Sequence, residues 1–255
     1  GTPNMADLFG KMADMQQRMA DIQAKLAELE AILVRHRDAQ VLEPLREGVG
    51  LVHRGVDDVR HPSLRQRRPM SVMLTDAEEG WVQFLYKTVG QGSSSLAHRK
   101  PGDSLSVLGP IGKGFALDNG RRRPLLLGGG VGIPPMIFTA SELRARSPGA
   151  VPLVLMGSEV PFPFDARPSE IIVPGMPAGV IAAMPLMEDW GIASRLASLQ
   201  DYAGCHEGYI TDLARHWLTS LSREERGEVY ILSCGPTPML KATAALAAEF
   251  GIPVQ

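Results

Sequence analysis

The sequence has few cysteines, almost no net charge and no long hydrophobic run. Its two cysteines, Cys205 and Cys234, make neither a disulfide framework nor, without further ligands, a zinc or iron–sulfur site. A formal net charge of −2 gives no bias towards nucleic acid or an anionic membrane. The apolar runs are far shorter than the roughly 20 residues that cross a bilayer, and no secretory signal is recognisable. These absences predict a cytoplasmic protein that binds neither nucleic acid nor membrane and supplies no metal site.

Glycine and proline are abundant instead, with 27 and 20 residues, and they cluster between short apolar runs. This pattern is typical of an α/β protein with tight, ligand-facing loops. With 255 residues, 44% of them hydrophobic, the chain is long enough to bury one or two cores.

Residues 5–34 have a helical period, with apolar side chains three and four residues apart. The stripe consists of Met5, Leu8, Met12, Met15, Met19, Ile22, Leu26 and Leu29. We expect a long amphipathic helix, with two interpretations left open. Residues 5–33 form either a homodimeric coiled coil or a helix that packs on its own chain.

The sequence pattern divides the remaining chain into two predicted domains. Residues 35–120 start with a mostly irregular stretch, 35–66, followed by short strands typical of an antiparallel barrel, at 70–74, 81–88 and 104–108. Residues 121–255 alternate strands and helices as a parallel sheet does. There we expect strands at 125–127, 151–156, 180–184 and 229–233 and helices at 135–146, 212–221 and 238–250.

Two glycine–proline turns carry the chemistry of the second domain. Gly128-Gly129-Gly130-Val131-Gly132-Ile133-Pro134-Pro135 follows an apolar strand and opens a helix, so its backbone can approach a pyrophosphate. Cys234-Gly235-Pro236-Thr237-Pro238-Met239 does the same after a later strand, and two such turns at one sheet edge would flank a dinucleotide. Cys234 is either a small buried residue or a neighbour of the nicotinamide. Either turn alone is also compatible with a tight connection that binds nothing.

The nucleotide is expected to be NAD rather than NADP. Glu159 follows the second strand of this domain, about 27 residues beyond Gly132, where a 2′-phosphate would require Arg or Lys. The alternative is that Glu159 is a solvated loop carboxylate.

The barrel region carries two phosphate-binding candidates. An arginine precedes an extended segment in Arg67-Arg68-Pro69-Met70-Ser71, and Gly90-Gln91-Gly92-Ser93-Ser94 offers amides and hydroxyls in a turn. Each, taken singly, is an ordinary strand end or loop.

Together and in this order, the motifs from about Arg67 to Gln255, roughly three-quarters of the chain, resemble the ferredoxin-reductase-like flavoproteins. They most closely resemble the electron-transfer subunits of bacterial dihydroorotate dehydrogenases, of pyrimidine biosynthesis. Residues 36–43 match more weakly, as a first barrel strand. The resemblance implies an N-terminal helix, a partial antiparallel FAD-binding barrel and a parallel-sheet NAD-binding domain.

The resemblance also assigns residues. Ser71 and Cys234 would be the catalytic residues, beside the flavin ring and the nicotinamide. The residues that would contact FAD are Arg68, Pro69, Met70, Ser71, Gly90, Gly92, Ser93 and Ser94. Those that would contact NAD(H) are Gly129, Gly130, Gly132, Pro134, Gly235, Pro236 and Met239. Glu159 is added to them by its position after the second strand, and not by the resemblance.

The implied activity is electron transfer from NADH through FAD to a catalytic dehydrogenase subunit. The family also carries a [2Fe-2S] cluster, whose four thiolates follow the region that here ends at Gln255, so this chain supplies no ligands for it. The stretch 42–67 is about half the family's length, which leaves the barrel incomplete. Two alternatives stay open: a stand-alone NAD(P)H-dependent flavin or ferredoxin reductase, and a non-catalytic oligomeric protein that keeps the fold.

Overall fold

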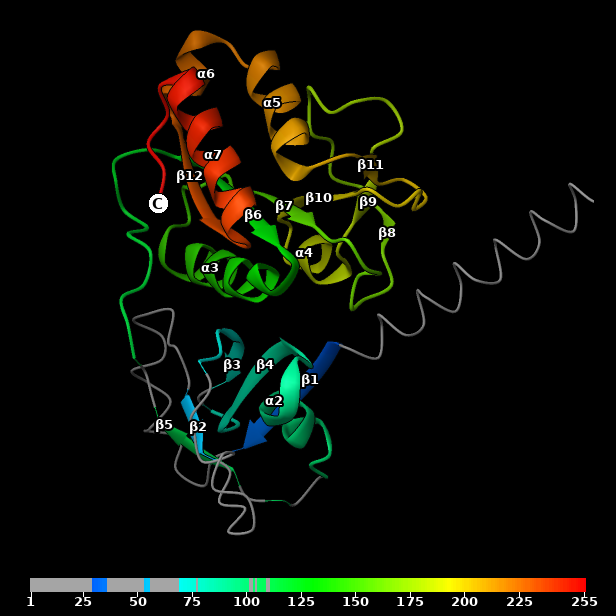
Figure 1. Ribbon diagram of the computed structural model, residues 1–255. Coiled ribbons are helices and arrows are strands. Elements are labelled where there is room, and N and C mark those ends of the chain that lie inside the picture. Colours follow the sequence, from blue (N-terminus) through cyan, green and yellow to red (C-terminus); the bar gives the residue numbers. More distant parts are fainter. Residues whose placement is uncertain are drawn as a thin grey trace, which may run out of the picture.

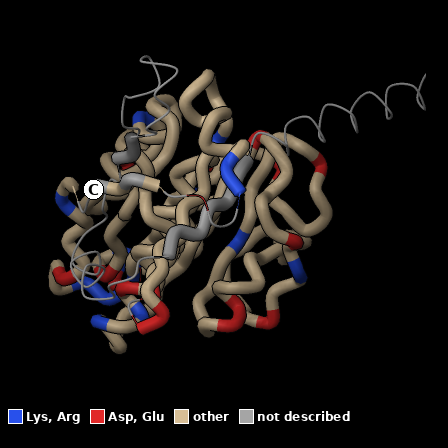
Figure 2. Tube along the Cα trace, turned by 90° about the horizontal axis from the view of Figure 1, so that it is seen from below, with Lys and Arg blue, Asp and Glu red and all other residues tan. Residues whose placement is uncertain are grey.

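The computed structural model describes residues 29–35, 53–55, 69–76, 78–100, 103, 105–108 and 111–255. In Figure 1 these residues form a smaller group of elements, up to β5, and a larger group built on a parallel sheet. Basic and acidic positions are mixed along the chain rather than gathered by sign (Figure 2). Within the described residues, no helix is both long and apolar enough to cross a membrane.

A five-stranded parallel sheet forms the centre of the larger group. Its order is β11-β10-β7-β6-β12. The strands are β6 (Arg123–Gly129), β7 (Leu153–Gly157), β10 (Ala193–Ser198), β11 (His206–Glu207) and β12 (Val229–Cys234). Leu125, Leu126 and Leu127 of β6 are fully buried, because helices cover both faces of a parallel sheet and its strands therefore read as continuous apolar runs.

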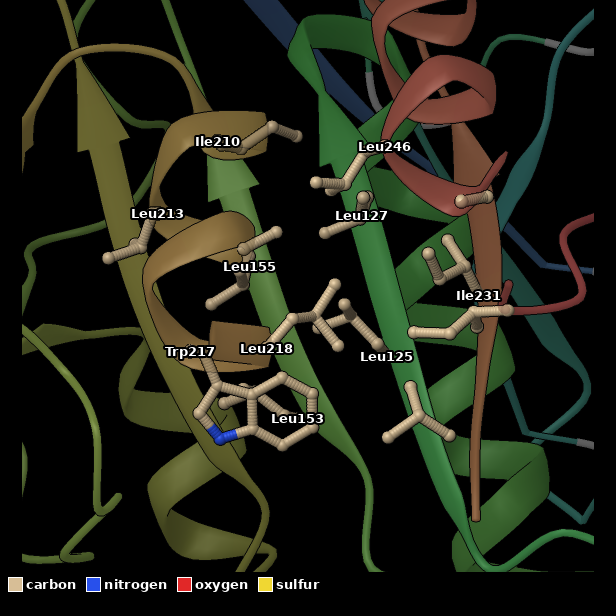
Figure 3. Close-up of a cluster of buried hydrophobic side chains, with 14 of the residues drawn as sticks. Leu125, Leu127, Leu153, Leu155, Ile210, Leu213, Trp217, Leu218, Ile231 and Leu246 are labelled. Carbon is tan, nitrogen blue, oxygen red and sulfur yellow. The ribbon is translucent and has the colours of Figure 1, made fainter. Parts of the chain in front are cut away.

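Alternate residues of the strands supply the two cores. Leu125, Leu127 and Ile231 pack with α5 (Ile210–Ser220) and α7 (Thr237–Phe250), and Figure 3 shows Trp217 and Leu246 reaching this face from the two helices. Leu126, Val154 and Leu232 face the other way. They pack with α3 (Ile133–Arg146) and α4 (Pro185–Asp189). The short helix α6 (Arg223–Gly227) leads into β12.

The smaller group contains an antiparallel sheet of order β1-β4-β3 and a two-stranded pair, β2-β5. The strands are β1 (Leu29–Arg35), β2 (His53–Gly55), β3 (Val72–Asp76), β4 (Trp81–Lys87) and β5 (Ser106–Leu108), and the helix α2 (Gly90–Ala97) follows β4. The predicted fold class, antiparallel strands followed by a parallel α/β sheet, is confirmed.

Two helix and strand predictions in the N-terminal part change. The predicted helix over 5–34 is wrong at its end, because residues 29–35 form β1 and pair with β4 from Leu29↔Lys87 to Arg35↔Trp81. This segment, LEAILVR, contains the β-branched Ile32 and Val34, which favour a strand when a partner is present. Residues 5–28, and with them the predicted dimer seam, lie outside the described residues, as does the predicted strand at 36–43. In the stretch predicted to be irregular, residues 53–55 form β2.

The predicted strand at 180–184 is also corrected. Only Ala182–Ala183 is extended, as β9, and it pairs antiparallel with β8 (Arg167–Pro168) outside the parallel sheet. The third long strand of the sheet along the chain is β10, which the sequence pattern did not predict. It begins with Ala193-Ser194-Arg195, where two polar residues interrupt the apolar pattern that marks the other strands.

Those two polar side chains attach the long connection between β7 and β10 to the sheet. Arg195 is only 4% exposed, and its guanidinium donates to the carbonyls of Val180 (3.1 Å) and Ile171 (2.7 Å). The Ser194 hydroxyl accepts a hydrogen bond from the Met184 amide (3.1 Å). β11 pairs only with the last two residues of β10. Beside the rest of β10, these hydrogen bonds supply partners for backbone carbonyls and an amide of the connection.

Candidate functional site

The two glycine–proline turns meet at the carboxyl edge of the parallel sheet. β6 and β12 are neighbours in register, with Cys234 opposite Gly128, so the chain leaves both strands at the same edge. The first turn continues as a short 3-10 helix, η3 (Gly130–Gly132), into α3, and the second opens α7. The sequence therefore located both turns and their shared edge.

Gly132 is the point at which the two turns touch. It is buried, and a β-carbon there would overlap the Cys234 carbonyl group and lie 2.7 Å from the Gly235 nitrogen. Its φ of −84° is open to any residue, so close approach of the two backbones is what requires glycine. Gly132 thus packs the turns together.

Gly130 has the opposite character. It is exposed, its φ is +54°, and a β-carbon there would meet nothing within 4 Å. Pro134 and Pro135, both buried in the first turn of α3, have no N–H to offer. An anion at this end of α3 would therefore be met by amides of η3, with Gly130 on the open side.

Met239 lies beneath the crossing of the turns. A β-carbon on Gly129 would collide with its sulfur, and one on Gly235 would lie 2.6 Å from the sulfur and 2.8 Å from the terminal methyl. The side chain is half-buried and packs against the core that contains Leu127 and Leu246. The thioether therefore fills space that the two glycines leave open.

Cys234 and Pro236 complete the second turn. Cys234 is half-buried at the end of β12, and burial raises the pKa of its thiol. A raised pKa keeps the sulfur protonated at neutral pH, which suits a packing role better than that of a nucleophile. Pro236 is exposed and is the N-cap of α7.

The neighbouring strand β7 ends at the same edge. Ser198, at the end of β10, donates a hydrogen bond from its hydroxyl to the Ser158 carbonyl (2.7 Å), which ties the loops after the two strands together. Glu159 follows and is exposed. Glu159, the carboxylate predicted to lie beside the ribose, thus follows β7, the strand next to β6, which leads into the first glycine turn. Ser198 was missed because the strand that carries it was missed.

The smaller sheet packs against the beginning of α3. β3 contacts α3, and β4 contacts η3. Val72, the first residue of β3, is completely buried, and the half-buried Leu74 packs against the core on the α3 face of the sheet. Ser71 directly precedes this strand, so the extended segment that begins at Pro69 runs into the side of the molecule that carries the glycine turn. Pro69 is exposed and Met70 half-buried, whereas Arg68 lies outside the described residues.

The predicted Gly-x-Gly-Ser-Ser turn is the first turn of helix α2. Gly90 has a φ of +72°, which requires glycine. The Ser93 hydroxyl accepts from the Val89 amide (2.6 Å) and donates to the Val89 carbonyl (2.7 Å), so this side chain organises the helix start. Gly92 and Ser94 are half-buried beside it. A glycine-rich helix N-terminus is a suitable anion site.

No cluster of three or more His, Cys, Asp or Glu side chains suited to a metal occurs among the described residues. The only cysteines of the sequence, Cys205 and Cys234, are both free.

Comparison with known proteins gives a consistent result, although no family model matches the chain. It is 28% identical over 207 residues to the "Dihydroorotate dehydrogenase B (NAD(+)), electron transfer subunit" of Geobacillus thermodenitrificans, covering 80% of this chain and 68% of that protein. The subunit of the same name from Bacillus caldolyticus is 37% identical over 109 residues, 42% of each chain. The resemblance read from the motifs is confirmed at the level of sequence.

Solved structures agree on the fold. An NADH-dependent reduced ferredoxin–NADP oxidoreductase superposes with a TM-score of 0.67 at 23% identity, covering 89% of this chain and 70% of that one. Phthalate dioxygenase reductase superposes with a TM-score of 0.57 at 15% identity, covering 90% and 63%. The chain has the ferredoxin-reductase fold.

Proposed function

We propose that this chain passes electrons from NADH through FAD to a partner, in the manner of the electron-transfer subunits that it resembles. The observation that carries the proposal is the meeting of the two glycine turns at one sheet edge, through Gly132 against Cys234 and Gly235. A dinucleotide laid across that edge has backbone amides on both sides. The smaller sheet packs on α3 and η3 beside the same turns, where a flavin would face the nicotinamide.

The nucleotide-binding residues divide by what surrounds them. Gly130 offers the open approach to the pyrophosphate, while Gly129, Gly132, Gly235 and Met239 keep the two turns in contact. Glu159 would accept hydrogen bonds from the ribose hydroxyls that distinguish NAD from NADP. Pro134 and Pro236 fix the starts of the two helices that frame the site.

The flavin-binding residues fit an anionic, extended cofactor. Gly90, Gly92 and Ser94 at the start of α2 would hold the pyrophosphate, with Ser93 shaping the turn. Pro69, Met70 and Ser71 would lie along the flavin, preceded by the guanidinium of Arg68. FAD, when bound, accepts a hydride and releases electrons one or two at a time. The protein's contribution is to hold the two rings against each other and exclude water.

The partner we propose is a catalytic dehydrogenase subunit. The relatives are named as electron-transfer subunits of dihydroorotate dehydrogenase, and a subunit that carries electrons must deliver them to another protein. A [2Fe-2S] centre on the route would take its ligands from outside this sequence, because Cys205 and Cys234 cannot supply four thiolates.

The experiment is an absorbance titration. Protein at micromolar concentration, mixed with FAD and freed of excess flavin, should keep the bound-flavin bands, and anaerobic addition of NADH should bleach them. Retention of no flavin would reject this function and favour the non-catalytic alternative. Rapid bleaching without any partner, followed by transfer to free flavin or ferredoxin at the same rate, would favour a stand-alone reductase.

A Gly130→Asn variant tests whether the first glycine turn binds the nucleotide. Asparagine tolerates the left-handed backbone at this position, so the fold is kept, while its side chain enters the open face of the turn. We expect weaker NADH binding and unaltered FAD binding. Equal loss of both ligands would mean that the turn is not a nucleotide site but a structural element of the whole protein.

A further inference from the structure

We infer that Met239 is an oxidation-sensitive residue of the nucleotide site, and that its conversion to the sulfoxide by hydrogen peroxide lowers the affinity for NADH. The effect on NADH rests on the proposed function, whereas the effect on packing does not. The inference starts from the position of the Met239 sulfur between Gly129 and Gly235, the two glycines whose missing side chains make room for it.

The space around this sulfur is limited on both sides. A single carbon added to Gly129 would overlap the sulfur, and one added to Gly235 would lie 2.6 Å from it. The oxygen of a sulfoxide is similar in size to that carbon and is attached to the sulfur itself. If it points towards either glycine, it separates the turns, because a close-packed site has no volume to absorb it.

Away from the glycines, the side chain packs against the core that contains Leu127 and Leu246. Oxidation converts the flexible apolar side chain into a polar one that no longer suits this core. The added oxygen and the added polarity therefore both disturb the packing of the two turns at the proposed nucleotide site.

Met239 is also partly exposed, which distinguishes it from the methionines in the core of the larger group. Met136, Met156 and Met187 are fully buried, whereas Met239 is half-buried at the mouth of the second turn. The neighbouring Cys234 competes poorly for peroxide, because burial raises the pKa of its thiol and the thiolate is the reactive form. In the reaction one peroxide oxygen is transferred to the sulfur, the O–O bond breaks and water leaves, so the thioether is oxidised and the peroxide reduced.

The test treats the full chain with hydrogen peroxide and quantifies oxidation of Met239 by peptide mass mapping. The NADH dissociation constant is then compared with its value before treatment, within each variant. We expect a rise of at least about tenfold in the unaltered protein. Incubation with methionine sulfoxide reductases A and B should reverse it. In Met239→Leu, which cannot be oxidised at this position, the ratio should stay near one, and in Cys234→Ser it should rise as in the unaltered protein.

Thermal unfolding gives a second readout that needs no nucleotide. Peroxide should lower the midpoint of the unaltered protein but not that of Met239→Leu. Full oxidation of Met239 with neither the midpoint nor the NADH affinity altered would overturn the inference. A protein that never bound NADH, yet showed the reversible fall in midpoint, would overturn the proposed function and leave the packing role of Met239 supported.

Discussion

Gly130 and Gly132 lie two residues apart, and glycine suits the two positions for different reasons. At Gly130 the left-handed backbone on an open face favours it, whereas at Gly132 the contact with the other turn requires it. The sequence pattern predicted the same role for both residues, because a glycine-rich motif does not distinguish a special backbone conformation from a close approach. Only the position of Cys234, more than a hundred residues later in the chain, makes the difference visible.

Gly132→Ala should destabilise the parallel-sheet domain. Its β-carbon would overlap the Cys234 carbonyl, so the turns must separate, and overpacking of this kind costs about 1–3 kcal/mol. Gly227→Ala is the matched control, since a β-carbon there meets nothing within 4 Å. Urea unfolding should show a lower midpoint for Gly132→Ala alone. Identical midpoints for the two variants would contradict the described contact.

Glu159→Gln should relax the choice between NADH and NADPH. The exposed carboxylate after β7 repels a 2′-phosphate, and like charges about 4 Å apart in water repel by about 1 kcal/mol. The ratio of flavin reduction rates with NADPH and NADH should rise by roughly fivefold. Glu224→Gln, on α6 at the other edge of the sheet, removes the same charge as a control. An unaltered ratio would assign Glu159 to the solvated loop surface.

His206 should make folding stability depend on pH. Burial lowers the pKa of its imidazole, the nearby His216 ring lowers it further, and Asp212 opposes the shift. Because the folded pKa lies below the unfolded value of about 6.5, the unfolded chain binds the proton more readily. The contribution is therefore fully present above about pH 6.5 and is lost as the pH falls through the folded pKa.

Melting curves at pH 7.5 and pH 5.5 check this prediction. The unaltered protein should lose more stability between the two conditions than His206→Gln does. His98→Gln, which alters an exposed histidine on the C-cap of α2, should behave like the unaltered protein. If all three proteins lose the same amount, another group controls the pH dependence.

At the level of elements, the local sequence pattern predicted the strands that consist of continuous apolar runs and the helices that have a clear helical period. β6, β7, β12, α3, α5 and α7 all lie within a few residues of their expected positions. β10 was missed because Ser194 and Arg195 interrupt its apolar pattern, and their role depends on the connection that they hold. β1 was assigned to a helix because its apolar spacing suits either structure, and pairing with β4 decides.

Arg195 is the side chain on which the connection before β10 depends most. Arg195→Met keeps the apolar stem but removes the donors to the Val180 and Ile171 carbonyls, and we expect a loss of about 2–4 kcal/mol. Arg167→Met is the control, because that guanidinium is half-exposed in its ion pair with Asp189 and should contribute about 0–1 kcal/mol.

Hydrogen exchange locates the effect. Amides of residues 169–184 should lose protection in Arg195→Met, while β6 and β12 keep theirs. Uniform loss of protection across the sheet would show that Arg195 supports the entire domain and not the connection in particular.

Over the whole molecule, α3 joins the two halves. Every residue from 133 to 140 is buried, which a helix at the surface of one sheet would not require. The sheet covers one side of α3 and β3 packs on another. The sequence predicted both halves and their order, but not this packing. Apolar residues on each side of α3 indicate only that the helix is hydrophobic, and they do not indicate which elements pack against it.

Leu74→Glu should therefore uncouple the halves without removing either binding site. The half-buried Leu74 packs from β3 onto the core that contains α3, and a carboxylate there would have to be hydrated, which separates β3 from the helix. Hydride transfer depends on ring-to-ring placement, and a displacement of about 1 Å can cost on the order of a hundredfold in rate. With both ligands saturating, stopped-flow absorbance should show flavin bleaching slowed by about that factor while the NADH dissociation constant stays the same. Leu240→Glu, on the partly exposed face of α7, should bleach at the normal rate. A normal rate in Leu74→Glu would mean that flavin and nicotinamide are aligned by contacts other than those between β3 and α3.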